Sequence, residues 1–496
     1  MRRWLSALLG MGLFVAAGTG AAFAAPAGNG GGDNVQNRGG GGELEYQDTI
    51  DLAYEDIQVF WEETLPDIYG LEYREIPEEN FVAYDEDTDS DDLPACGDEN
   101  VTYEDVADNA FYCVLGADEG EDFVAYDDGS LFPRLFEDFG PFALVQVLAH
   151  EWGHAIQGQA LTFDEFVNAP SIQKELQADC WTGAYVAWVD AGDSEAFVTE
   201  PGDLETGLAG MLEFADPLGV DPTEQGAHGN GFDRTNAFSE GLEQGPQRCA
   251  EYDDLSLLPP VTEIPFTTEE DLANEGNLPI DEAIEFGIED LDLYWSVVFE
   301  VSGLEYDGIE EGVESFDPRR KSSLPECEAL DLAPRKPKAY TGAVFYCPGE
   351  EFIAYDENII EDAHGNIGDF AAMLLIGNAW AAGMQEDLEL EGGPAQVDCF
   401  SGSYAGSIPI EIDGDGIADF SANGGPVVRD PDPPTGDPLA AILLSPGDLD
   451  EVVQSFLLFS EPAAGNDPDQ LTAYTRLQFF RQGFFNGEEE CSAIEA

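Results

Sequence analysis

The feature that most constrains the fold of this chain is that its sequence repeats once. The segment NAFYCVLGADEGEDFVAYDD, which starts at Asn109, is matched by GAVFYCPGEEFIAYDEN, which starts at Gly342. Three further segments, ELQADCWTGAY, EPGDLE and FDRTNAFSEGL, recur in the same order as PAQVDCFSGSY, SPGDLD and YTRLQFFRQGF. Matches in one order at similar intervals indicate a tandem duplication of a large unit rather than a solenoid of short repeats. We therefore expect two domains, residues 44–265 and 266–496.

The eight cysteines follow the same repeat, with four in each copy. An even number of cysteines in an exported chain predicts disulfide bonds, and we expect these to hold the fold together without taking part in chemistry. Four cysteines leave three pairings open in each copy. We expect neighbours along the chain to pair: Cys96 with Cys113, Cys180 with Cys249, Cys327 with Cys347, and Cys399 with Cys491.

The N-terminal segment is typical of an export signal. In residues 1–25, Arg2 and Arg3 precede an apolar run, and the segment ends in small residues. Residues 26–43 are rich in glycine and polar, which predicts a flexible leader. No later stretch is long and apolar enough to predict a membrane-spanning helix. We expect a secreted, extracellular protein with no integral membrane segment once the signal is removed.

The charge of the chain excludes some classes of partner. Acidic residues number 104 against 17 basic ones, which gives a net charge of -87. Such a field repels nucleic acid and anionic membrane surfaces, so we expect no nucleic-acid partner. The same self-repulsion destabilises a compact state unless salt screens it, which favours a halophilic or salt-tolerant source. An ordinary acidic exported protein is the alternative.

The stretch GPFALVQVLAHEWGHAIQGQ, which starts at Gly140, predicts a helix with a Gly-Pro start and apolar residues at helical spacing. His150 and His154, four residues apart, share one face of that helix and can bind one ion at about 2.0–2.1 Å. Half of the four histidines of the chain lie in this apolar helix, and buried imidazoles need partners. A metal site is therefore favoured over polar surface. Glu151 lies beside that face, where it can take a proton from an activated water.

A second predicted helix offers further polar groups. Glu175, in ELQAD, is the best candidate for a third zinc ligand, and Asp179, one turn later, can accept the outer N–H of a ligand histidine. Solvated surface is the alternative for both carboxylates. His228 and Tyr185 are candidates to stabilise the oxyanion that develops during attack on a carbonyl, while a loop histidine without a role is the alternative for His228.

The segment EDFVAYDD, residues 121–128, predicts a strand. It is expected either at the edge of a sheet, where it can pair with an extended peptide, or inside a small sheet.

Together, HEWGHAIQ and ELQADC resemble the bacterial neutral zinc metallopeptidase family, over about residues 90–250. The resemblance implies a helix-rich, zincin-like α+β domain with a small sheet. It also implies zinc held by His150, His154 and Glu175, with Glu151 as general base. The chain differs from the family in its acidity and in extra residues between Cys113 and the following strand.

The second copy lacks this set of residues. Asn378 stands at the position of His150 and Ala382 at that of His154. Ala379 replaces Glu151, Pro394 replaces Glu175, and Gln470 replaces His228. Asp398 and the cysteines remain, and His364 lies outside the aligned helix. We expect the second copy to be a degenerate, pseudo-enzyme domain without metal ligands.

An insertion in the second copy contains EIDGDGIADF, in which Asp413, Asp415 and Asp419 have spacings that resemble a calcium loop. Chance spacing of carboxylates in an acidic chain is the alternative.

These patterns lead us to expect a secreted zinc metallopeptidase, a metalloendopeptidase acting on a peptide or protein substrate, with Zn²⁺ and a candidate Ca²⁺ as cofactors. One alternative is an inert extracellular binding or scaffold protein that retains a structural zinc. A second alternative is a zinc amidase acting on a cell-wall substrate, because zinc and a base serve any amide.

Overall fold

The fold is described from a computed structural model of the chain. It describes residues 10–12, 36–37, 44–96, 101–114, 122–200, 202–220, 226–262, 264, 266, 268–330, 332–333, 337–408, 410–412, 416–418, 442–460 and 471–494. The expected signal peptide and Gly-rich leader lie outside the described residues, apart from two short strands. The expected calcium ligands Asp413, Asp415 and Asp419 also lie outside them.

The chain divides into two compact units, Met1–Glu263 and Ile264–Ala496, called here the first and the second unit. The repeat in the sequence placed the corresponding boundary between residues 265 and 266.

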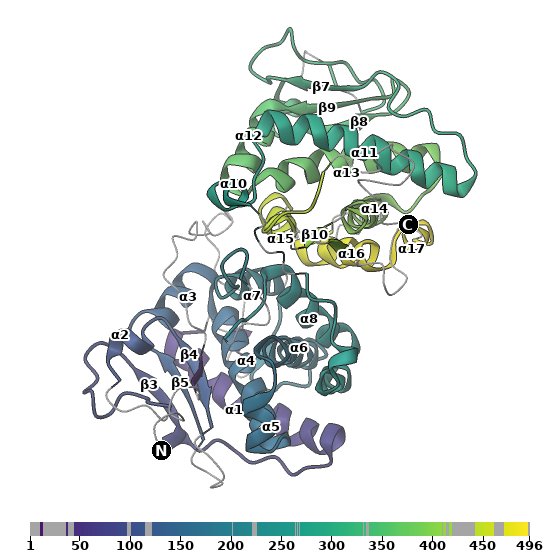
Figure 1. Ribbon diagram of the computed structural model, residues 1–496. Helices are drawn as coiled ribbons and strands as arrows, with labels where there is room; N and C mark the ends of the chain where they lie inside the picture. The colour runs from purple at the N-terminus through teal and green to yellow at the C-terminus, as the bar shows by residue number, and fades with distance from the viewer. Residues whose placement is uncertain are drawn as a thin grey trace. The chain divides into compact units, whose positions relative to one another are not determined.

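The first unit is built mainly of helices around a small sheet (Figure 1). Its helices are α1 (Tyr46–Tyr69), α2 (Tyr103–Val106), α3 (Leu131–Phe139), α4 (Pro141–Ala160), α5 (Phe163–Asn168), α6 (Ser171–Asp190), α7 (Asp203–Leu212), α8 (Gly231–Gln244) and α9 (Pro246–Ala250). Its strands are β1 (Gly10–Gly12), β2 (Gln36–Asn37), β3 (Phe81–Tyr84), β4 (Ala110–Cys113), β5 (Phe123–Asp127) and β6 (Phe197–Val198).

The main sheet of the first unit has the strand order β1-β4-β5-β3. Strand β5 pairs in parallel with β3 and antiparallel with β4, while β1 pairs antiparallel with the other edge of β4. Residues Phe123–Asp127 of this segment therefore form an internal strand, which is the second of the two positions expected for it and not the sheet edge. Both sides of β5 are already hydrogen-bonded to protein, so an incoming peptide cannot pair with it.

Helix α4 is the core helix of the first unit. It begins with Gly140 at a φ of 83° followed by Pro141, a pair that suits a helix N-terminus. Every residue from Pro141 to Gln157 is buried, because α1, α3, α6, α7 and β4 all contact this helix. Polar side chains on α4 are therefore held inside the protein, where they need partners.

The second unit repeats this plan (Figure 1). Its helices are α10 (Glu269–Ala273), α11 (Ile280–Ser302), α12 (Glu357–Asn366), α13 (Asp369–Asp387), α14 (Gly393–Ser407), α15 (Asp448–Phe459), α16 (Ala473–Asn486) and α17 (Glu488–Ser492). Its strands are β7 (Val313–Phe316), β8 (Val344–Cys347), β9 (Phe352–Asp356), β10 (Ile410–Ile412) and β11 (Gly416–Ala418). The sheet order is β7-β9-β8, with β9 parallel to β7 and antiparallel to β8, as β5 is to β3 and β4.

The repeat extends to the packing of single residues. Helices α6 and α8 cross so closely that a Cβ on Gly241 would lie 1.7 Å from the carbonyl oxygen of Cys180. In the second unit, a Cβ on Gly483 would lie 1.8 Å from the carbonyl oxygen of Cys399, where α14 crosses α16. Only glycine fits either position, so the two copies share one helix-crossing geometry.

Four disulfide bonds join the neighbouring cysteines of each copy. They link Cys96 with Cys113, Cys180 with Cys249, Cys327 with Cys347, and Cys399 with Cys491. These are the four expected pairs. The Cys180 bond ties α6 to α9, and the Cys399 bond ties α14 to α17 in the same way.

The helix-rich α+β architecture with a small sheet in each unit confirms the predicted fold class. Within the described part of the chain, no helix has the length and apolar character that crossing a membrane requires.

Candidate metal centre

The two histidines of HEWGH lie on the buried face of α4 that contacts α6. His150 is 4% exposed and His154 is 2% exposed. Between them, Gly153 faces α6 so closely that a Cβ there would lie 2.9 Å from the Cα atom of Ala178. The glycine thus lets the two helices approach, and it brings side chains of α6 within reach of both imidazoles.

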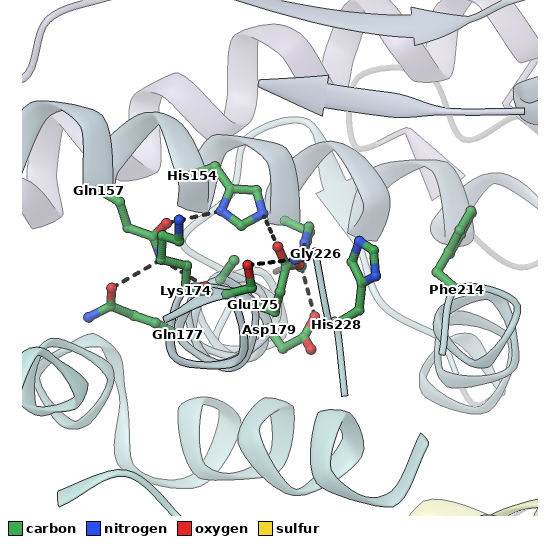
Figure 2. A network of polar contacts seen from close by, with 12 residues as sticks. His154, Gln157, Lys174, Glu175, Gln177, Asp179, Phe214, Gly226 and His228 are labelled. Atoms are coloured by element: carbon green, nitrogen blue, oxygen red, sulfur yellow. Dashed lines mark hydrogen bonds and ion pairs between the residues drawn. The ribbon is translucent and has the colours of Figure 1, made fainter. Parts of the chain in front are cut away.

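Glu175, on the first half of α6, faces both histidines. One carboxylate oxygen lies 3.2 Å from Nε2 of His150, and the other lies 3.5 Å from Nε2 of His154. Figure 2 shows His154 and Glu175 turned toward each other between the two helices. The structure therefore brings together the three residues expected to bind zinc.

Each imidazole is held from behind through its other nitrogen. Nδ1 of His150 donates to Asp179 at 2.8 Å. Nδ1 of His154 donates to the side-chain oxygen of Gln157 at 3.0 Å (Figure 2). Gln157 is oriented in turn, because its amide nitrogen donates to the carbonyl oxygen of Lys174 and to Gln177. Outer hydrogen bonds of this kind fix the tautomer of a ligand histidine and present Nε2 to the metal.

Arg234, on α8, completes the surroundings of Asp179. Its guanidinium donates two hydrogen bonds of 2.8 Å to the Asp179 carboxylate and a third to the carbonyl oxygen of Phe214. Both side chains of this ion pair are almost fully buried. Asp179 is thus clamped between a cation and a histidine, in the role expected from the sequence.

The donor set fits a zinc ion. Ligand atoms of His150, His154 and Glu175 all lie within 4.8 Å of one another. Ligands at about 2.0–2.1 Å from a tetrahedral ion lie roughly 3.3–3.4 Å apart. The two nitrogen–oxygen distances, 3.2 and 3.5 Å, bracket that value. Two imidazoles and one carboxylate are the donor set of many catalytic zinc sites.

The electrostatics of the site reflect its burial. Burial alone would lower the pKa of His150, but the carboxylates of Asp179 and Glu175 raise it to about 10. Burial would raise the pKa of Glu175, whereas His154, His228 and His150 hold it well below its ordinary value. Asp179 likewise keeps a lowered pKa despite its burial, because of Arg234 and His150. Metal binding to Nε2 of His150 would displace the proton that the neighbouring Glu175 carboxylate favours on that nitrogen.

Glu151 is buried beside this cluster, with 1% of its surface exposed. The backbone N–H of Tyr112 approaches its carboxylate, and neither carboxylate oxygen has another hydrogen-bond partner among the described residues. Burial raises its pKa to about 8. A carboxyl group held in this way inside a protein needs a further partner, such as a water or a substrate, and its raised pKa suits a group that accepts and returns a proton near neutral pH.

His228 lies in the loop before α8 and is buried. Its Nδ1 lies 3.2 Å from Asp216, whose other carboxylate oxygen accepts the backbone N–H of His228. Burial would lower the pKa of His228, but Glu175 and Asp216 raise it. The structure thus places His228 within the electrostatic reach of Glu175.

Tyr185 does not belong to the site, and its predicted role at the oxyanion is wrong. Its hydroxyl donates to Asp56, on α1, at 2.7 Å, and its ring packs against Phe60 and Trp188. It lies on α6, ten residues beyond Glu175, in the aromatic core between α1 and α6. The hydroxyl of Tyr185 therefore serves as hydrogen-bond donor to the buried Asp56 carboxylate.

The second unit keeps the outer groups and lacks the inner ones. Arg476 donates to Asp398 at 2.9 and 2.6 Å, as Arg234 does to Asp179. Gln385 donates to Gln396, whose amide donates to the carbonyl oxygen of Cys491, matching the chain of contacts from Gln157 through Gln177 to Cys249. In place of the ligands there is a cavity of about 450 Å³, whose lining includes Asn378, Ala379 and Ala382.

Sequence reasoning missed Arg234 and Gln157. A signal for both was present, because the repeat preserves them as Arg476 and Gln385. A polar residue kept in both copies of a diverged repeat indicates a shared structural role, here the polar contacts between packed helices, and in the first unit the same contacts also reach the two imidazoles.

Part of the chain is similar to bacterial proteins. It is 28% identical over 170 residues to an uncharacterised protein of Mycobacterium tuberculosis, covering 30% of this chain and 56% of that protein. It is 31% identical over 161 residues to an uncharacterised protein of Escherichia coli, covering 28% of this chain and 52% of that protein. The chain thus spans about half the length of the curated relatives it matches. No protein-family model and no solved structure matches it.

Proposed function

We propose that the first unit is a zinc-dependent metallopeptidase, similar to the bacterial neutral zinc metallopeptidases. The observation that carries the proposal is the convergence of His150, His154 and Glu175, with each imidazole fixed from behind and Glu151 buried beside them. His150, His154 and Glu175 would hold the ion. A bound zinc supplies a Lewis acid that polarises a carbonyl and acidifies a water.

Glu151 acts as the general base and then as the general acid. Its buried carboxylate takes a proton from the water that attacks the scissile carbonyl, and it returns this proton to the leaving nitrogen. His228, oriented by Asp216, donates a hydrogen bond to the oxygen on which negative charge develops. Asp179 and Gln157 stay outside the reaction and hold the two imidazoles.

A peptide substrate would pair with β4 rather than with β5. Strand β4 contacts the active-site helix α4, and among the described residues its outer edge pairs with β1, which belongs to the expected signal peptide. Removal of residues 1–25 would leave this edge ready to pair with an extended peptide backbone. Four disulfide bonds support secretion, because such bonds persist in oxidising compartments.

The test is cleavage of casein by the secreted full chain at high salt, with zinc content measured for each sample. Glu151→Gln keeps the size of the side chain and leaves the three ligands in place. We expect it to bind one zinc ion per chain and to lower kcat by about 10²–10⁴-fold, the range for loss of a general acid–base group. Asn378→Ala, at the His150 position of the second unit, is the matched control and should leave both zinc content and activity unchanged.

The alternatives give different results in the same assay. A scaffold protein with a structural zinc would bind the ion but cleave no substrate, and wild type and Glu151→Gln would then behave alike. A cell-wall amidase would leave casein intact and release fragments from peptidoglycan in a Glu151-dependent way. Either result would overturn the peptidase proposal.

The second unit is proposed to be a pseudo-enzyme domain. Within its described part, the positions that match the three ligands and the base hold Asn378, Ala382, Pro394 and Ala379, and none of these residues supplies a strong zinc ligand or a base. Its role would then lie in packing, substrate docking or regulation.

A further inference from the structure

Three buried carboxyl groups meet in the second unit, away from the cavity that replaces the metal centre. Asp369 opens α13, and Asp448 and Glu451 lie on the first turn of α15. They form the tricarboxylate cluster, in which one oxygen of each residue lies within 4.8 Å of the others. All three side chains are at least nine-tenths buried, with exposures of 4%, 4% and 5%.

Neighbouring N–H and hydroxyl groups donate hydrogen bonds to only some of the carboxylate oxygens in this cluster. Glu451 accepts the N–H groups of Phe370 and Ala371, at the start of α13, while Asp448 accepts the backbone N–H and the hydroxyl of Ser445. Among the described residues no lysine or arginine pairs with these carboxyl groups, although the imidazole of His364 lies within electrostatic reach of Asp369. Three buried negative charges are therefore unfavourable unless something positive joins them.

Asp369 gives the independent indication of a ligand. One of its carboxylate oxygens accepts the backbone N–H of Leu278 at 3.0 Å. The backbone N–H groups of Phe370 and of Asp369 itself also approach this carboxyl, but its second oxygen is buried and accepts no hydrogen bond of normal geometry from the described residues. A buried polar atom without a partner in a native protein calls for an explanation such as a bound ion.

The first unit shows which carboxylates of this cluster the shared fold requires. Asp448 matches Asp203 of the first unit, and both accept a backbone N–H three residues earlier, so this carboxylate serves the turn before the helix. The other two acids are particular to the second unit, because Pro141 and Thr206 stand at the positions of Asp369 and Glu451. The shared turn needs neither of them.

We propose that the tricarboxylate cluster binds one hard divalent cation, with Ca²⁺ as its occupant. Ca²⁺ takes oxygen ligands at about 2.3–2.6 Å, so ligands on opposite sides of the ion lie roughly 4.6–5.2 Å apart, which accommodates oxygens within 4.8 Å of one another. The cation would join the N-termini of α13 and α15. It would thereby stabilise the second unit, where the positions of the three zinc ligands hold other residues.

The test measures Ca²⁺ bound at equilibrium by the zinc-saturated full chain in molar salt, where weak binding to the acidic surface is screened. Wild type is compared with the double variant Asp369→Asn/Glu451→Gln, which keeps the shape of both side chains and one accepting oxygen in each. We expect wild type to bind one more Ca²⁺ per chain than the variant. Calcium bound elsewhere on the chain is common to both proteins and cancels. Asp203→Asn, in the first unit, is the matched control and should bind as many ions as wild type.

Thermal unfolding gives a second measurement that does not depend on the stoichiometry. Without divalent cations, the double variant should melt above wild type, because it lacks two of the buried charges. Added Ca²⁺ should raise the melting temperature of wild type by mass action and reverse the order. Equal Ca²⁺ binding by wild type and variant, with equal shifts in melting temperature, would overturn the proposal and would mean that the cluster is neutralised by protons. A one-ion difference seen with Mg²⁺ but not with Ca²⁺ would overturn the assignment of the occupant.

Discussion

Asp179→Asn tests whether the buried carboxylate behind His150 serves the metal as well as the fold. The side chain of Arg234 is 2% exposed and makes two of its hydrogen bonds to Asp179. Removing one partner of such a buried pair costs about 3–5 kcal/mol of stability. Loss of a group that orients a ligand histidine lowers metal affinity by about 10–100-fold, or roughly 1.4–2.7 kcal/mol. We therefore expect two separate effects from one substitution.

The duplicated chain supplies the control. Asp398→Asn removes the same bidentate partner from Arg476, but no histidine lies in front of it. The side chain of Arg476 is 23% exposed, so we expect a smaller loss of stability than in the first unit. Zinc affinity, measured by competition with a chromophoric chelator, should be unchanged in Asp398→Asn and lowered in Asp179→Asn. Stability is measured by denaturant unfolding of the zinc-free proteins.

Two results would refute this reasoning. Zinc affinity equal to that of wild type in Asp179→Asn would mean that the imidazole needs no support from behind. An equal fall of zinc affinity in both variants would mean that general destabilisation, and not the orientation of His150, causes the effect.

Three further predictions concern stability and packing. Gly153→Ala places a Cβ 2.9 Å from the Cα atom of Ala178. The resulting overpacking should lower the free energy of unfolding by about 1–3 kcal/mol and should also lower zinc affinity. Unchanged zinc affinity with full stability would contradict the close approach of the two helices. Burial raises the pKa of Asp203 to about 7, so its contribution to stability is full below pH 4 and is lost as the pH rises through 7. Asp203→Asn should abolish this pH-dependent loss of stability, which is on the order of 4 kcal/mol at most. The same pH profile of unfolding in wild type and variant would show that Asp203 does not cause it. Replacing Cys180 and Cys249 by alanine opens a loop of sequence separation 69 and should lower the free energy of unfolding by about 4 kcal/mol. A loss below about 1 kcal/mol would show that this bond constrains the unfolded chain little.

The inner part of the candidate site could be predicted from sequence because local geometry determines it. Two histidines four residues apart on a helix face the same way, whatever surrounds the helix. Glu175 and Asp179 were found for the same reason, since their spacing places them on one face of α6. The fold class followed from the family resemblance, and its duplication followed from the repeat.

The errors arose where tertiary contacts decide. Tyr185 lies on the same helix as Glu175, but which neighbour receives its proton depends on α1, which is more than a hundred residues away in sequence. The strand at residues 123–127 has a pattern that fits an edge or an interior position, and its two neighbours come from separate parts of the chain. The tricarboxylate cluster was hidden for the same reason. Its members come from two helices, in a chain where acidic residues number 104.

The duplication separates what the fold needs from what the proposed chemistry needs. Asp398, Arg476 and the glutamine pair persist in the second unit although the histidines are gone, so they stabilise the helix packing without a metal. In the first unit the same groups point at His150 and His154, which indicates that the ligands use a scaffold whose polar contacts are required in any case. Loss of the ligands then leaves the scaffold intact. A degenerate copy can therefore remain folded and be free to acquire other groups, such as the two additional carboxylates at its helix N-termini.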